Sequence, residues 1–421
     1  MRLIKRVGKV FLIIIAVLAI AWCCLYIYAK FFYNQEVEVE KIYMSEIPVE
    51  PSDFLADFEE IHHLVLDHYS LYKTKQLNMD SLHQVFYSRL QDGVKSKKEY
   101  GLLLQEYFAL LKVGHAFVFF MNYTANYTPL FINNSLYLND PNDYLNAYGF
   151  LDKDQIIGIN GCSLKEWLDE NLKYTPASTC QSKRLLTALR AFRSPTDTLR
   201  NYIVLRGNDT LSIELPLKPF DYFPEVKQEI VEYKILQDSI GYIAIHSMMN
   251  DVVDDFIKAY NKVKAYPYLV IDVRQNGGGN SGNGLEICEY LINKEQPHCV
   301  DPQYIMKPKT DAFQGAIYAL TSRYTFSAAE SFVLDLRESG KVILVGDCTA
   351  GDTGNRPRTF KTKQGVAFRV PTKNAAISPK GFPMEGEGIP PHHFVLQSVP
   401  DFMKDVDTQL EYVLQLISKG N

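Results

Sequence analysis

The sequence predicts an α/β core that follows a small helical domain and a β-rich domain, all behind one membrane-spanning helix. Three observations carry this prediction. One uncharged run lies near the N-terminus, apolar residues at helical spacing follow it, and strands, loops and helices alternate in the second half. The chain has 421 residues. At roughly 150 residues per domain, that length allows two or three domains, each with its own core.

Composition narrows the functional classes. The chain is 47% hydrophobic and 22% charged, as expected for a folded protein. Its formal net charge of −5 offers no basic footprint for a phosphate backbone, so we expect no nucleic-acid partner. Seven Cys are too few for a disulfide scaffold and form no CxxC pair. The neighbours His298 and Cys299 lack a second pair at ligand spacing, so we expect no metal.

Residues 10–29 are twenty consecutive residues without a charge. At about 1.5 Å per residue, a helix of that length spans roughly 30 Å of bilayer hydrocarbon. Four basic residues lie within residues 1–9, which predicts a cytoplasmic tail. We therefore expect a single-pass cell-membrane protein with the remaining chain on the periplasmic or extracellular side, after a stalk over residues 31–51. A signal peptide cleaved near Ala19-Ile20-Ala21 is the alternative.

The spacing of apolar residues over residues 52–116 predicts a small N-terminal helical domain. After a Ser at position 52, apolar residues recur at helical spacing, and a second helix is expected over residues 96–111. Ser96 and Glu99 have the spacing of a capping box at its start. The loop that follows contains His115.

Residues 117–218 predict a β-rich domain. Residues 202–205 and 211–217 flank the turn at 207–209, and their alternating polarity predicts a hairpin with one buried face. The segment DKDQIIGINGCSL, residues 152–164, resembles part of PDZ domains, so this domain is expected to be PDZ-like.

Residues 230–400 alternate strand and helix and predict the α/β core, followed by a C-terminal helix over residues 401–421. The stretch 268–273 is almost continuously apolar, as a buried parallel strand requires. A glycine-rich loop at 277–284 and a helix follow it. In such a fold, sites form at the carboxyl ends of the strands.

Three segments of this core offer chemistry. The loop at 272–284 has consecutive glycines, which allow backbone N–H groups to converge on one site. Ser327 follows a strand and starts a helix, where a nucleophile can be exposed in the positive end of the helix dipole. Taken alone, plain N-capping explains this serine better. The third segment, residues 381–391, carries Glu385 and Glu387.

In this order, the segments resemble the protease core of the tail-specific (C-terminal-processing) and tricorn serine peptidases, whose cores have ClpP/crotonase-like β-loop-α units. The resemblance covers roughly residues 235–400. The matching blocks are Asp272-x-Arg274-x-Asn276-x-Gly278-Gly279, Ser327-Ala328-Ala329-Glu330, Val345-Gly346-x-x-Thr349-x-Gly351 and Glu385-Gly386-Glu387-Gly388-Ile389-Pro390.

One departure separates the two branches. The tail-specific branch has a catalytic Lys twenty-five residues after its Ser, but that position holds Asp352 here. An Asp cannot serve as the neutral-amine base. The tricorn branch draws its base from a His in an earlier loop, and His115 fits that loop, so the chain is more similar to the tricorn branch. The resemblance implies Ser327 as nucleophile, His115 as general base and Glu385 as the group that orients the imidazole. It also implies an oxyanion hole formed by the N–H groups of Gly278 and Ala328.

The implied function is a membrane-anchored serine peptidase that hydrolyses protein or peptide substrates through an acyl-enzyme, without a metal or organic cofactor. Two alternatives stay open. One is a non-catalytic member of the fold that binds a peptide or another ligand. The other is a dinucleotide-binding enzyme, because Gly277, Gly279 and Gly282 satisfy GxGxxG and Asp301 lies about twenty residues further on.

Overall fold

The computed structural model describes residues 15, 17–24, 47–225 and 229–419. The predicted tail, most of the run 10–29 and most of the stalk lie outside these residues. Residues 17–24 are helical and exposed. Within the described ranges, no helix is both long enough and apolar enough to cross a membrane.

The helical unit, residues 51–116, contains η3 (Pro51–Asp53), α2 (Phe54–His68), α3 (Met79–Gly93) and α4 (Lys97–Ala109). The predicted capping box is present: Ser96 accepts from the Glu99 N–H, and the Glu99 carboxylate accepts from the Ser96 N–H. Helix α3 had no counterpart in the sequence prediction.

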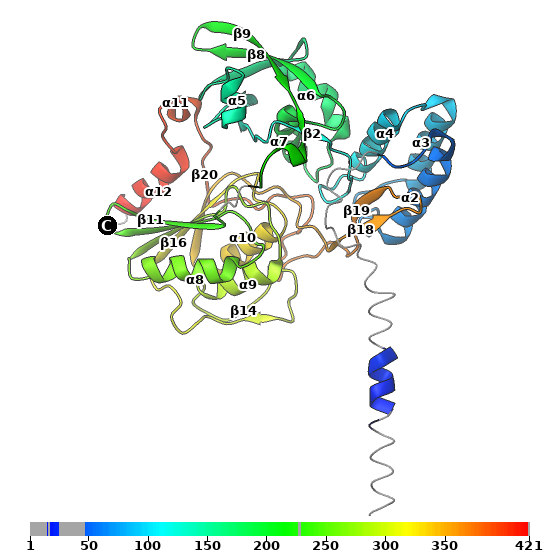
Figure 1. Cartoon of the computed structure of the whole chain (residues 1–421). Coiled ribbons are helices and arrows are strands. Elements are labelled where there is room, and N and C mark those ends of the chain that lie inside the picture. Colours follow the sequence, from blue (N-terminus) through cyan, green and yellow to red (C-terminus); the bar gives the residue numbers. More distant parts are fainter. Residues whose placement is uncertain (1–14, 16, 25–46, 226–228, 420–421) are drawn as a thin grey trace, which may run out of the picture.

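The helical unit shares its core with a distant part of the chain. Strand β1 (Phe117–Val118) pairs with β19 (Ala367–Pro371), which pairs with β18 (Pro357–Lys361). Phe360 and Phe368 of this hairpin are buried among the apolar side chains of α2 and α4. Figure 1 shows the orange hairpin beside the blue helices. The sequence prediction had placed this hairpin in the α/β core.

The β-rich unit, residues 123–219, is built on a sheet of order β3-β4-β5-β8-β9, with β6 paired to β5. The predicted hairpin is confirmed as β8 (Leu199–Arg206) and β9 (Asp209–Pro216). Helices α6 (Leu164–Asn171) and α7 (Cys180–Leu189) belong to this unit. Its other elements are β2 (Tyr123–Thr124), β3 (Leu130–Ile132), β4 (Ser135–Tyr137), α5 (Asp143–Ala147), β5 (Gln155–Ile159), β6 (Cys162–Ser163), η4 (Leu172–Tyr174), η5 (Arg190–Phe192), β7 (Arg193–Ser194) and β10 (Lys218–Pro219). The turn η6 (Phe220–Tyr222) leads out of it.

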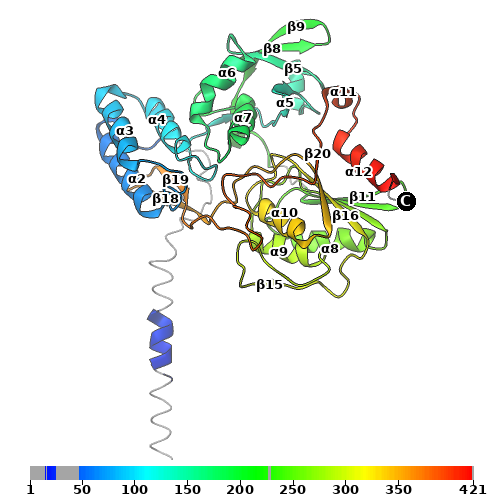
Figure 2. The same ribbon diagram turned by 180° about the vertical axis from the view of Figure 1, so that it is seen from behind.

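The α/β core, residues 231–419 without the β18–β19 hairpin, has a six-stranded sheet of order β11-β12-β13-β16-β17-β20. Strand β11 is antiparallel to its neighbour and the other strands are parallel. Helices α8, α9 and α10 share one apolar cluster with the sheet, and α12 covers another part of it (Figure 2). The elements are β11 (Val231–Leu236), β12 (Ile240–Ile245), α8 (Val252–Val263), β13 (Tyr268–Asp272), α9 (Ser281–Glu289), β14 (Gln296–Pro297), β15 (Ile305–Met306), β16 (Ala316–Thr321), α10 (Ala328–Ser339), β17 (Val342–Gly346), β20 (His393–Phe394), α11 (Val399–Phe402) and α12 (Thr408–Lys419).

The parallel register brings the carboxyl ends of the central strands together. Asp272 on β13 lies beside Leu320 on β16, and Thr321 lies beside Gly346 on β17. The loops that leave these ends therefore emerge at one edge of the sheet, and they contain the glycine-rich loop, Ser327 and Asp352.

Candidate active site

Ser327 lies between β16 and α10, at the N-terminal end of the helix. Its φ of 59° is positive, which is uncommon for a residue with a side chain. Such strained backbone persists where the surroundings impose it, often at functional sites. The turn directs the Ser327 hydroxyl toward an imidazole rather than leaving it as a simple helix cap.

The imidazole is that of His115, in the loop after α4. Its Nε2 lies 3.0 Å from the Ser327 Oγ. The ring stacks on Phe326, with 4.4 Å between the ring centroids. Two residues 212 positions apart in sequence are thus brought together, as the sequence prediction expected.

The other imidazole nitrogen contacts Asp352, not Glu385. His115 Nδ1 forms a short hydrogen bond with the Asp352 carboxylate, which also accepts the N–H of Gly114. Burial acts to raise the pKa of Asp352, but the facing imidazole and these hydrogen bonds outweigh it and hold the pKa below its ordinary value. The expected position of Glu385 against the imidazole is therefore wrong.

Gly114 explains how an aspartate can occupy this place. A Cβ at position 114 would lie 2.7 Å from Asp352 Oδ2 and 3.2 Å from the Phe326 ring. Any residue with a side chain before the histidine would therefore collide with the carboxylate. Gly114 and Asp352 are therefore sterically complementary. Together they are the signal in the sequence that could have identified Asp352.

Glu385 is a neighbour of Asp352, and its side-chain contacts are with Lys75 and Asn355 instead of His115. It is the bridge partner of Asp352 in the backbone, but its side chain turns to Lys75, with 2.6 Å from Nζ to Oε1, and to Asn355, at 3.0 Å. Burial and the charge of Asp352 raise the pKa of Glu385 to about 7, against the effect of Lys75. Lys75, from the chain between α2 and α3, is a contact that the sequence analysis missed.

Glu330 is a buried carboxylate that links the two loops of the site. It accepts the backbone N–H groups of Ser327 (3.2 Å), Gly351 (2.7 Å) and Asp352 (2.8 Å), and the Thr349 hydroxyl (2.6 Å). Burial raises its pKa to about 8 despite these bonds. The sequence placed Glu330 in a motif but gave it no role. In the structure it fixes the start of α10 against the Asp352 loop.

The two expected oxyanion donors are backbone N–H groups near the Ser327 hydroxyl, and they differ in whether the N–H already has an acceptor. Ala328 is the first residue of α10, where an N–H has no acceptor within the helix. Gly278 packs so closely that a Cβ there would lie 2.6 Å from the Ser327 Cβ. Its N–H, however, donates to Asn276 Oδ1 at 2.9 Å. Gly278 could serve as a donor only if this bond were shared or broken.

Among the described residues, one group of side chains has the composition of a metal site. His298, Cys299 and Asp335 are buried, with ligand atoms within 4.8 Å of one another. All three groups have hydrogen-bond partners: His298 Nδ1 lies 2.6 Å from Asp335 Oδ2, the backbone N–H of Cys299 donates to Oδ1 at 2.9 Å, and the Cys299 thiol donates to the Ser331 carbonyl at 3.3 Å. We therefore interpret the group as a hydrogen-bonded link between α10 and the chain after α9.

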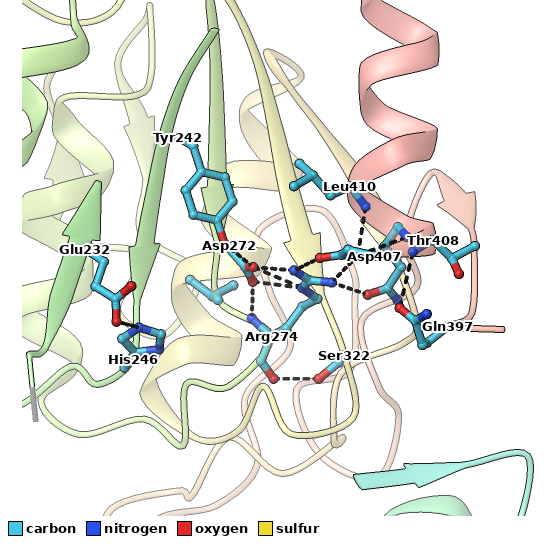
Figure 3. Close-up of polar contacts among 12 residues, drawn as sticks. Glu232, Tyr242, His246, Asp272, Arg274, Ser322, Gln397, Asp407, Thr408 and Leu410 are labelled. Atoms are coloured by element: carbon cyan, nitrogen blue, oxygen red, sulfur yellow. Dashed lines mark hydrogen bonds and ion pairs between the residues drawn. The ribbon is translucent and has the colours of Figure 1, made fainter. Parts of the chain in front are cut away.

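A cavity of about 660 Å³ lies between the β-rich unit, the strand ends and the chain before α12; none of Ser327, His115 and Asp352 lines it. Its lining includes Phe131 on β3, Tyr324 close to the nucleophile turn, and Arg274. Figure 3 shows the Arg274 guanidinium between the carboxylates of Asp272 and Asp407. These bonds fix the start of α12 against the carboxyl end of β13, and so shape this wall of the cavity.

The Ser327 hydroxyl, the His115 imidazole and the Asp352 carboxylate are hydrogen-bonded in a row. This is the arrangement of a serine hydrolase site, here at the edge of an α/β sheet. Comparison with known proteins assigns the chain more closely. Residues 239–395 match the model for Peptidase family S41, and residues 131–217 match that for the Bacteroidetes S41 family N-terminal domain. The chain belongs to peptidase family S41. Because the first match includes the glycine-rich loop, the dinucleotide-binding alternative has no remaining support.

Both branches of the family occur among the relatives. The carboxy-terminal processing protease CtpB of Bacillus subtilis (strain 168) is 26% identical over 64% of this chain and 53% of its own length. The tricorn protease of Thermoplasma acidophilum is 26% identical over 42% of this chain and 17% of its own length. The chain thus spans about half of the first relative and far less of the second.

A solved structure is similar over most of the chain. Mature CPAF complexed with lactacystin has a TM-score of 0.73 at 13% identity, over 88% of this chain and 99% of that one. At such low identity, the likeness extends to the fold alone.

Proposed function

We propose that this protein is a serine peptidase in which Ser327 is the nucleophile, His115 the general base and Asp352 the group that orients the imidazole. One observation carries the proposal: His115 contacts the Ser327 Oγ through Nε2 and the Asp352 carboxylate through Nδ1. This is the arrangement that a hydroxyl needs in order to attack a carbonyl.

The reaction follows from this geometry. His115 Nε2 takes the Ser327 proton as Oγ bonds to the substrate carbonyl carbon, and the carbonyl oxygen becomes an oxyanion. The ionised Asp352 stabilises the resulting imidazolium and fixes its tautomer. Collapse of the intermediate expels the amine, which receives the proton from His115 and leaves an acyl-enzyme. A water molecule, activated in the same way, releases the acid product.

The oxyanion would form at the N-terminal end of α10. There the N–H of Ala328 and the positive end of the helix dipole would stabilise developing negative charge. Gly278 would add a second donor once its bond to Asn276 opens.

We propose protein or peptide substrates, because the relatives are named proteases and two of them are named carboxyl-terminal processing proteases. The cavity of about 660 Å³ is large enough for several peptide residues, and Tyr324 in its wall is three residues before Ser327, so a peptide bound there would have to extend to the nucleophile. Its walls come from both the β-rich unit and the α/β core, so a bound chain would contact both.

The test is labelling of the full chain with a fluorophosphonate probe, followed by mass spectrometry of the modified residue. We expect modification at Ser327, and loss of both labelling and peptide hydrolysis in Ser327→Ala. Ser418→Ala, the same change on the exposed side of α12, serves as the control. A Ser327→Ala variant that still hydrolyses peptides, or a wild-type enzyme that never labels, would reject the assignment and favour a non-catalytic, ligand-binding protein.

We also propose that residues 10–29 anchor the enzyme in the cell membrane, with the site on the periplasmic or extracellular side. The support is the uncharged twenty-residue run and the basic residues before it. Protease added to spheroplasts should digest residues 47–419, and deletion of residues 1–30 should release a soluble, active protein. Full-length protein that is protected from external protease would refute this orientation.

A further inference from the structure

A second cavity, of about 250 Å³, lies between α4 of the helical unit and the β-rich unit. None of the residues that line it belongs to the site around Ser327. Four of them are cationic and one is a carboxylate: Lys98, Arg190, Arg193, Arg200 and Asp197. The lining therefore has an excess of three positive charges, in a protein whose overall charge is −5.

Arg190 contributes a positive charge without a carboxylate partner among the described residues. Its guanidinium donates to the Tyr174 carbonyl at 2.7 Å and to Gln105 Oε1 at 2.8 Å, both uncharged oxygens. Burial lowers the pKa of Arg190 to about 10, and the nearby charge of Arg200 acts in the same direction. An anion at this place would relieve both effects.

Arg193 has weaker hydrogen bonds than Arg190. Its Nη2 makes a long hydrogen bond to Thr128 Oγ1, at 3.3 Å. Its Nε is buried and has no hydrogen-bond partner in the described part of the chain. Burial lowers its pKa as well. A buried guanidinium N–H without an acceptor costs free energy of folding, so such groups normally donate to an acceptor on the protein or on a bound molecule.

The single carboxylate does not neutralise the group. Asp197 lies 3.4 Å from the Nε of Arg200, and its side chain is 35% exposed. Arg200 also donates to the carbonyls of Arg190 and Ala191, at 2.7 Å and 2.5 Å, and is itself almost fully buried. These backbone contacts hold the Arg200 charge beside Arg190, and Asp197 is the one carboxylate among the lining residues that faces the two like charges.

We propose that this cavity binds a phosphate- or sulfate-class oxyanion between α4 and the β-rich unit. Guanidinium groups are the preferred protein donors to tetrahedral oxyanions, because their planar fork presents several N–H groups at once. The excess of three positive charges favours a doubly charged ligand over a single carboxylate. Lys98, which is exposed on α4, would reach the same ligand from the helical unit.

Binding would connect the two units. The ligand would contact Lys98 on α4 and arginines of the β-rich unit, and α4 leads directly into the loop of His115. The bound anion should therefore stabilise the junction between the units. This inference does not depend on the proposed peptidase activity.

The experiment measures binding of inorganic phosphate and sulfate to the full chain by titration calorimetry, with thermal unfolding in parallel. Chloride and acetate at matched ionic strength are the reference salts. We expect saturable binding of one phosphate or sulfate per chain and a rise in Tm that follows saturation. Arg193→Gln should weaken binding about tenfold or more, as the loss of one charge-assisted hydrogen bond does.

Arg89→Gln is the matched control. It removes the same charge from the surface of α3, where Arg89 pairs with Glu106, and should leave the affinity unchanged. Lys98→Gln, on an exposed position of α4, should also weaken binding and guards against a folding defect in Arg193→Gln. Equal stabilisation by chloride, tighter binding of acetate than of phosphate, or equal affinity of the Arg193 and Arg89 variants would each overturn the proposal.

Discussion

The substitution Asp352→Asn tests the catalytic series most directly. The Asp352 carboxylate accepts from two sides: Oδ1 faces His115 Nδ1 and, at 3.2 Å, the N–H of Gly354, while Oδ2 faces the N–H of Gly114. An asparagine has one oxygen and one amide nitrogen to offer. The Gly114 N–H can only donate, whereas the imidazole can change its tautomer. The amide oxygen should therefore turn to Gly114, and the NH₂ group to His115.

This orientation leaves Nδ1 as an acceptor and places the proton on Nε2, so the imidazole can no longer accept the Ser327 proton. The reverse orientation buries NH₂ against the Gly114 N–H. That contact costs about 1–3 kcal/mol. Part of this cost is offset, because the reverse orientation also removes the weaker clash between the NH₂ group and the Gly354 N–H. Roughly tenfold fewer molecules then have a competent base. Loss of the charged hydrogen bond to the imidazolium removes another 1.5–3 kcal/mol or so from the transition state. The expected fall in kcat is about 10²–10³-fold.

The assay is steady-state hydrolysis of a fluorogenic peptide by the full chain, with kcat and KM measured separately. Because Asp352 is not expected to touch substrate, KM should change little. Glu385→Gln is the matched control, since it makes the same chemical change in a neighbouring buried carboxylate that contacts Lys75 instead of His115. A fall of less than tenfold for Asp352→Asn, or a larger fall for Glu385→Gln, would refute the assignment of Asp352.

Three further predictions concern the residues around the series. Burial raises the pKa of Glu330 to about 8 from an ordinary 4.5, so the folded protein holds a proton there that the unfolded chain releases. Stability to urea should therefore fall as pH rises from about 5 to 8, and a Glu330→Gln variant that kept this slope would refute the cause. Gly354→Ala places a Cβ 3.0 Å from the imidazole Nε2 and should lower kcat tenfold or more. Gly381→Ala, at the same φ of +87° in open space, should not. Lys75→Met removes the cation from buried Glu385, so the pKa of Glu385 should rise further above 7 and the carboxyl should take up a proton. The loss of stability in urea unfolding should therefore be larger at pH 8 than at pH 6; an equal loss at both pH values would contradict a buried ion pair.

The sequence alone determined what depends on local pattern. A buried strand, a turn and a helix in succession locate Ser327, because strand and helix periodicity are visible within a few residues. The hairpin β8–β9 and the capping box of α4 were found in the same way. The twenty-five-residue spacing also drew attention to Asp352, though only as a missing lysine.

What the tertiary structure decided is which side chains face each other across long separations. His115 reaches Ser327 because the β18–β19 hairpin packs into the helical unit and holds the end of α4 beside the sheet edge. Asp352 and Glu385 are bridge partners in the backbone, so both were candidates for the imidazole. The orientation of each side chain made the choice: one carboxylate points to His115 and the other to Lys75.

The arginine-lined cavity is the feature that the sequence indicates least, because it depends wholly on how two units pack. Lys98 and Arg193 lie on different units and form no pattern in sequence, and each alone would be taken for a solvated surface charge. Their positive charges act together only where the two units meet and line one cavity. Periodicity reports the burial of each residue separately, whereas a site depends on distances between atoms that only the packed chain fixes.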